Sequence, residues 1–148
     1  MLMGSKQLER LFRKAASLDI DKSDLKRLSD FIAQRLRDLL LLGQAAASRN
    51  GRDIIDYPDV PITKGLAANI QDFKAMDEQL NLSTILEQLA GLPPLKLGYS
   101  EELTRRIPEL VGGITVSLAR VLRALNEQMK NPGAEEWEKA ERIYEILL

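Results

Sequence analysis

Acidic side chains give this sequence its two candidate metal-binding arrangements. Residues 19–24, Asp-Ile-Asp-Lys-Ser-Asp, have the spacing that opens a calcium-binding loop, with ligands at Asp19, Asp21 and Ser23. The sixth position of such a loop needs Gly for a sharp turn, and the twelfth needs a bidentate Glu. Here those positions hold Asp24 and Asp30. A helix cap explains these acids more simply than calcium does.

The second arrangement is a run of glutamates near the C-terminus: Glu135, Glu136, Glu138, Glu141 and Glu145. Di-iron sites of the ferritin type combine such glutamates with Glu-x-x-His pairs. The sequence contains no His. Acids at the start and along the solvated side of a helix are the better interpretation, because they complement the helix dipole. We therefore expect no metal and no cofactor.

The residues that most enzymes use for nucleophilic or acid–base chemistry are absent. Without Cys or His, the chain excludes thiolate nucleophiles, Ser–His triads and most transition-metal sites. It also lacks a phosphate-binding P-loop, a dinucleotide glycine fingerprint and a G-x-S-x-G elbow. A pair of Asp or Glu residues remains an open route to catalysis, but no pattern marks one. We expect a non-enzymatic protein.

Charge and hydropathy further narrow the class of protein to which this chain can belong. The 148 residues include 21 basic and 22 acidic side chains, a formal charge of −1, which disfavours a strongly basic nucleic-acid binder. The longest apolar run is Leu39–Leu42, far short of the roughly 18–20 residues that span a bilayer. We expect a cytoplasmic protein without a membrane-spanning segment.

The elements that would carry these residues are helices, because apolar residues recur with helical spacing almost throughout. The pattern predicts helices that begin at Ser5, Asp21, Asp59, Ser83, Ser100 and Ala134. Their order is short, long, short, and then short, long, short. Pro108 either kinks the helix over residues 100–129 or divides it in two. Gly112 and Gly113 indicate either a close backbone approach or a kink, and the leucines at 39–42 indicate a helix covered on several sides.

A repeated short–long–short triplet resembles the histone fold, and two triplets in one chain resemble the tandem histone-fold proteins of bacteria and archaea. The specific match is Gly51–Val60, Gly-Arg-Asp-Ile-Ile-Asp-Tyr-Pro-Asp-Val, which is similar to the second histone loop and the start of the third helix. Residues 18–21 resemble the first loop. Residues 83–148 match by helix order only, since Trp137 stands where the corresponding Asp would be.

This resemblance implies an all-α protein, a single compact domain over residues 1–148. Two histone-like halves, residues 5–75 and 83–148, would pack as an intramolecular pseudo-dimer. It also implies a structural ion pair between Arg52 and Asp59, and contact with DNA. Because both halves lie in one chain, we expect a monomer.

The charges leave two functions open. The four expected inter-helix loops sum to −3, whereas in the first helix four basic residues stand against Glu9 alone. One hypothesis is a histone-like nucleoid protein that binds DNA weakly and in a salt-sensitive manner through Lys6, Arg10, Arg13, Lys14 and Lys22. In histones a Thr two residues after the loop Arg meets DNA, but here that residue is Ile54. The alternative is therefore a histone-fold module that binds another protein and not DNA.

Overall fold

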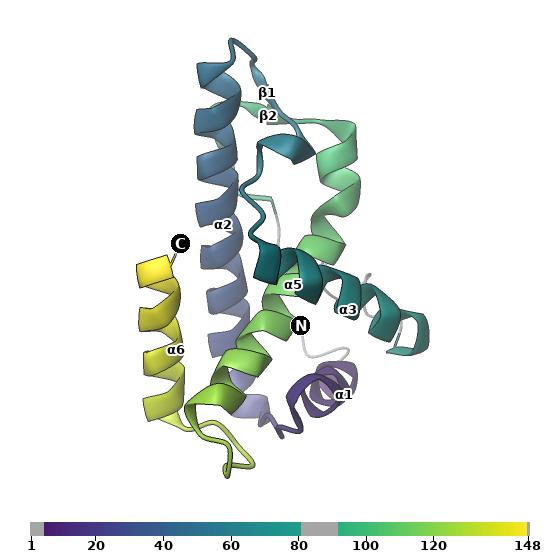
Figure 1. Cartoon of the computed structure of the whole chain (residues 1–148), viewed down its shortest axis with the longest axis vertical. Coiled ribbons are helices and arrows are strands. Elements are labelled where there is room, and N and C mark those ends of the chain that lie inside the picture. Colours follow the sequence, from purple (N-terminus) through teal and green to yellow (C-terminus); the bar gives the residue numbers. More distant parts are fainter. Residues whose placement is uncertain (1–4, 81–91, 148) are drawn as a thin grey trace.

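Helices make up most of the structure, a computed structural model that describes residues 5–80 and 92–147 (Figure 1). Within these residues there are five α-helices and one parallel two-stranded sheet. In chain order the elements are α1 (Ser5–Ala16), η1 (Lys22–Asp24), α2 (Leu25–Arg49), β1 (Ile54–Ile55), η2 (Tyr57–Asp59), α3 (Lys64–Leu80), β2 (Gly98–Tyr99), α5 (Glu101–Leu125) and α6 (Ala134–Leu147).

The helix lengths follow the expected order where it can be checked. Helices α1, α2 and α3 contain 12, 25 and 17 residues, and α5 and α6 contain 25 and 14. The short helix expected from Ser83 lies outside the described residues. Helix α5 is continuous through Pro108, so the expected helix over residues 100–129 is a single helix that ends at Leu125.

Local capping explains two of the helix starts. The Ser100 hydroxyl accepts a hydrogen bond from Leu103 N–H (3.0 Å) and caps α5, as the sequence predicts. At the start of the second long helix, the Asp24 carboxylate accepts from Asp21 N–H (3.3 Å) across the short 3-10 turn η1. The turn and α2 follow each other without a break, so Asp21 begins this helical segment as expected.

The predicted start of α3 at Asp59 is wrong. Helix α3 begins at Lys64, and the Thr63 hydroxyl accepts from Leu66 N–H (3.2 Å) as its cap. Asp59 instead ends the 3-10 turn η2, where its carboxylate is already bound by Arg52 and by Asp56 N–H. An Asp before a helical pattern is a cap only when its oxygens are free for the helix.

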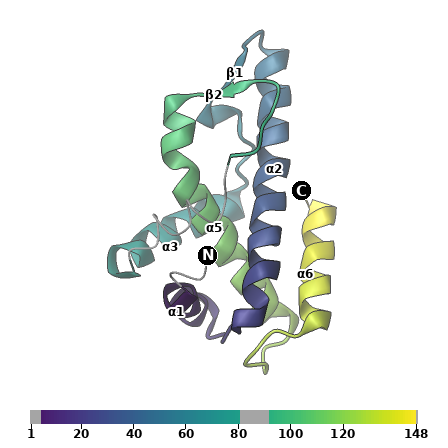
Figure 2. The same ribbon diagram turned by 180° about the vertical axis from the view of Figure 1, so that it is seen from behind.

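The core draws on both halves of the sequence. Buried side chains come from α1, α2, α3, α5 and α6, and the largest of them is Trp137 on α6. Leu39 and Leu40 are fully buried, but Leu41 and Leu42 are 37% and 47% exposed. The expected cover on several sides of α2 therefore includes Leu39 and Leu40 but does not extend to Leu41 and Leu42. Helix α6 runs beside α2 (Figures 1 and 2).

Gly112 and Gly113 allow a close helix approach, and the helix that approaches is α3. A Cβ added at Gly112 would lie 2.3 Å from the Phe73 ring, and one at Gly113 would lie 2.4 Å from Ile70 Cγ1. A larger side chain at either position would force Phe73 or Ile70 to shift. Helix α3 crosses α5 at this point (Figure 1). The two glycines therefore fix where α3 packs.

Loops from the two halves pair at both ends of the molecule. At one end β1 and β2 are parallel, with Ile54 opposite Gly98 and Ile55 opposite Tyr99. At the other end Asp19 N–H donates to the Lys130 carbonyl (2.8 Å). The two long helices α2 and α5 therefore extend between the same two pairs of loops (Figure 2). At each end, a loop from the first half of the chain is hydrogen-bonded to a loop from the second half.

Candidate functional site

The predicted cationic surface lies on α1 and continues to η1. Its five members, Lys6, Arg10, Arg13, Lys14 and Lys22, are all exposed. At 3.6 residues per turn the four on α1 fall within about 100° of the helix circumference. The opposite side of α1 carries Leu8, Leu11 and Phe12, which are buried against the core. The amphipathic pattern therefore turns these basic side chains to solvent together.

Part of this surface is already neutralised. The Arg13 guanidinium donates to Asp19 Oδ1 from Nη2 (2.9 Å) and from Nε (3.2 Å). Lys22 lies between the acidic residues Asp21 and Asp24, and burial raises the pKa of the Asp24 carboxyl. The surface is thus a set of exposed cations with carboxylates at its edge.

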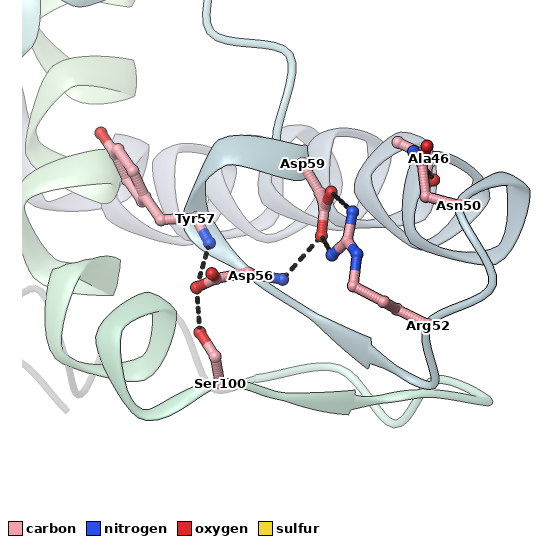
Figure 3. Close-up of polar contacts among 7 residues, drawn as sticks. All are labelled: Ala46, Asn50, Arg52, Asp56, Tyr57, Asp59 and Ser100. Atoms are coloured by element: carbon pink, nitrogen blue, oxygen red, sulfur yellow. Dashed lines mark hydrogen bonds and ion pairs between the residues drawn. The ribbon is translucent and has the colours of Figure 1, made fainter.

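The ion pair between Arg52 and Asp59 is present and bidentate, with both N···O distances 2.6 Å (Figure 3). The Arg52 side chain is 45% exposed and the Asp59 side chain 6%. Hydrogen bonds from Arg52 hold the pKa of Asp59 below its usual range, and Asp59 raises the pKa of Arg52. Arg52 therefore fixes the loop, and its two terminal nitrogens are occupied.

The pair continues into a hydrogen-bonded chain that joins the two halves. Asp59 Oδ2 accepts from Asp56 N–H (2.8 Å), and Asp56 Oδ1 accepts from Tyr57 N–H (2.9 Å) and from the Ser100 hydroxyl (2.7 Å) (Figure 3). The bond from Ser100, and then that from Tyr57, lowers the pKa of Asp56. The same Ser100 oxygen caps α5, so the chain ends at the start of the second long helix.

Beside this chain, Ile54 stands in strand β1 with 48% of its surface exposed. The resemblance to histones implies a Thr at this position. An exposed isoleucine side chain has no polar group to offer a phosphate. The side chain at position 54 therefore offers no hydrogen bond to a nucleic acid.

Sequence reasoning missed Arg123, which organises the opposite end of the molecule. Its Nε donates to the Ala16 carbonyl (2.8 Å) and its Nη2 to the Ser17 carbonyl (2.7 Å). Its Nη1 donates to the Glu127 and Met129 carbonyls (2.9 and 2.8 Å). One guanidinium thus donates hydrogen bonds to main-chain carbonyls at the end of α1 and in the loop that follows α5. The partners are main-chain atoms, so no residue type in the sequence marks them.

A second missed residue is Arg35 in the middle of α2, which is only 5% exposed. Its Nη2 donates to Glu145 Oε1 (2.8 Å), and its Nη1 lies 3.5 Å from Asp38 Oδ2. Its Nε and Nη1 make no hydrogen bond within the described part of the chain. A buried guanidinium with unsatisfied N–H groups is costly, which makes Arg35 a candidate for ligand contact.

Neither candidate metal arrangement forms a cluster within the described residues. Across residues 5–80 and 92–147 no group of three acidic side chains is placed to hold a metal ion. Asp19 is bound by Arg13, and Asp21 Oδ1 accepts from the Asn131 side chain (3.2 Å). In the same described ranges, no helix is both long and apolar enough to cross a membrane.

Known proteins with similar sequences include two from Aquifex aeolicus (strain VF5), each described as an uncharacterised protein. One is 30% identical over 136 residues, covering 83% of this chain and 79% of the relative. The other is 25% identical over 127 residues, covering 86% and 74%.

Two solved structures share the fold. A crystal structure of a Thermus thermophilus protein has a TM-score of 0.88 at 49% identity and covers 100% of both chains. A crystal structure from Aquifex aeolicus has a TM-score of 0.85 at 24% identity, with 98% of this chain and 95% of that chain covered, a likeness of fold alone. A match over residues 8–145 shows the family: the chain belongs to the one described as "Domain of unknown function (DUF1931)".

Proposed function

We propose that this chain is a histone-fold pair within one polypeptide, a non-enzymatic protein that binds DNA weakly and without sequence preference. The helix order and the loop pairing at both ends support the histone fold. So does the Arg52–Asp59 pair, because the resemblance implies an Arg and an Asp at that spacing, next to a short strand. Loops joined across halves would replace the contacts between two histone chains.

The observation that carries DNA binding is the shared exposure of the α1 cations. Lys6, Arg10, Arg13 and Lys14 occupy one side of a helix whose other side is buried, and Lys22 follows on η1. Phosphate neutralisation supplies essentially all non-specific DNA affinity, and a robust binder makes about 6–10 such contacts. Five cations fall short of that number, so the affinity is low and strongly dependent on salt.

The existing partners of three arginines also limit the affinity for DNA. Arg13 is paired with Asp19, Arg52 with Asp59, and Arg123 with main-chain carbonyls. A phosphate would have to compete with these existing partners. DNA contact is therefore expected on the open side of α1 and not at the paired loops. A protein that holds DNA in this way would be associated with the nucleoid.

The test is a fluorescence-anisotropy or gel-shift titration with duplex DNA from low to physiological salt. Replacing Arg10, Arg13 and Lys14 with Ala should abolish the shift. A matched control replaces three exposed cations on other helices, Arg37, Arg105 and Arg142, and should retain it. Absence of a shift at low salt, or an equal loss in the control, would contradict DNA binding. Thermal unfolding of both variants establishes that they are folded.

Exposed apolar side chains favour a second function, docking of another protein. Leu41 and Leu42 on α2 and Ile146 and Leu147 on α6 are large and exposed, and Ile54 is exposed in β1. If DNA does not bind, these exposed side chains support the alternative of a histone-fold interaction module. Sedimentation at micromolar concentration should give the 16.6 kDa of a monomer, since both halves are supplied by one chain. A dimer mass would contradict that expectation.

A further inference from the structure

A groove of about 530 Å³ lies between α2, α3, α5 and α6, away from the α1 cations. Apolar side chains from all four helices line it, among them Leu39, Leu66, Ile114 and Ile143. Its size falls within the roughly 300–1,000 Å³ typical of small-molecule sites. Helix α6 runs beside α2 and α3 crosses α5, so no single element forms this groove (Figures 1 and 2).

The charged residues in the lining of the groove are all basic. Arg35 and Arg120 both line the groove, and no Asp or Glu does among the described residues. The acidic partners Asp72 and Glu145 meet these arginines outside the lining. A mostly apolar wall with two guanidinium groups and no carboxylate is complementary to a molecule with a hydrocarbon body and one anionic group.

Unsatisfied donors give this complementarity an atomic basis. Arg35 is almost completely buried, yet its Nε and Nη1 lack hydrogen-bond acceptors within the described residues. Arg120 uses Nη1 for Asn69 Oδ1 (2.5 Å) and Asp72 Oδ2 (2.8 Å), and its side chain is 40% exposed. An anionic oxygen at the groove would supply an acceptor that the protein does not.

We propose that the groove binds a single-chain anionic amphiphile, a carboxylate with a linear hydrocarbon tail, with Arg120 and Arg35 at the carboxylate and the aliphatic wall around the tail. Arg35 is neutralised by Glu145 and lies near Asp38, so its role is to donate hydrogen bonds. Arg120 is likewise paired, with Asp72, but it lies at the more exposed part of the lining, where it can contact a free anion. This site goes beyond DNA binding and does not depend on it.

The experiment is calorimetric titration of the whole chain with dodecanoate below its micelle concentration. We expect saturable binding of one molecule per chain. Dodecan-1-ol, which has the tail without the charge, and acetate, which has the charge without the tail, should each bind at least about tenfold more weakly. Equal binding of dodecyltrimethylammonium would overturn the proposal, because the groove would then recognise only hydrocarbon.

Two variants locate the site. Arg120→Gln should weaken dodecanoate binding about tenfold, whereas Arg105→Gln, on the same helix but outside the lining, should leave it unchanged. Ala124→Trp places a large side chain in the groove and should abolish binding without removing a charge. Circular dichroism establishes that each variant is folded. Undiminished binding in folded Ala124→Trp, or equal effects of the two arginine variants, would refute the site.

Discussion

The crossing of α3 over α5 makes a quantitative prediction for Gly112→Ala. The added Cβ would lie 2.3–2.4 Å from three atoms of the Phe73 ring, more than 1 Å inside ordinary van der Waals contact. The ring is 1% exposed, so it has no open space to move into. Either the ring leaves its rotamer or α3 moves away from α5, and both break packing in the core.

The magnitude follows from two opposing effects. Overpacking a core costs typically about 1–3 kcal/mol, and a contact as close as this one belongs at the upper end. Replacing Gly by Ala inside a helix stabilises the folded state by about 0.5–1 kcal/mol. The variant should therefore lose roughly 2 kcal/mol of unfolding free energy, a fall in Tm on the order of 5–10 °C for a chain of this size.

The assay is urea and thermal denaturation followed by circular dichroism. Gly65→Ala is the matched control, because it lies in α3 and a Cβ there meets nothing within 4 Å. The control should be neutral or slightly stabilised. In a Phe73→Leu background, Gly112→Ala should cost less, since the ring no longer occupies the space. If Gly112→Ala is as stable as Gly65→Ala, α3 does not pack on α5 as described.

Three further predictions concern the polar contacts. Arg123→Lys should cost about 1–3 kcal/mol of unfolding free energy, because one ammonium cannot bind carbonyls in both segments at once. Amide hydrogen exchange should become faster at residues 17–19. Unchanged exchange at these residues would contradict the role of Arg123. Asp59 has a lowered folded-state pKa, so its stabilisation is complete above the unfolded value of about 4 and is lost as pH falls through the lower folded value. Asp59→Asn should therefore flatten the acid side of the stability profile, and a profile parallel to the wild type would argue against the pair. Burial raises the pKa of Tyr144 to about 12, so spectroscopic phenolate titration should lose its highest-pH step in Tyr144→Phe.

The elements that local chemistry determines were predictable from the sequence. Ser100 caps α5 as expected, because the hydroxyl and the N–H it binds are three residues apart. The cations of α1 share a solvent side because helical periodicity separates them from Leu8 and Phe12. In both cases the relevant partners lie within one or two turns, so their spacing alone carries the information.

The features that the sequence did not predict depend on contacts between distant segments. By residue type, Asp59 and Thr63 are equally good caps for α3. Arg52 binds the Asp59 carboxylate, and Thr63 is the residue that caps the helix. Arg123 binds main-chain carbonyls more than 100 residues away, and nothing in the sequence near it signals that role. Leu41 and Leu42 are exposed whereas Leu39 and Leu40 are buried, and only tertiary packing distinguishes these four leucines.

The pairing of loops at both ends has a consequence for how the chain folds. Ile55 pairs with Tyr99, Ser17 accepts from Arg123, and Asp19 donates to Lys130, all across long stretches of sequence. Closing such loops costs entropy before their contacts form, so the chain should fold more slowly than a helical bundle with local contacts. During synthesis the first three helices would leave the ribosome with Phe73 and Ile70 uncovered until Gly112 and Gly113 emerge. The last third of the chain therefore determines when the first half becomes native.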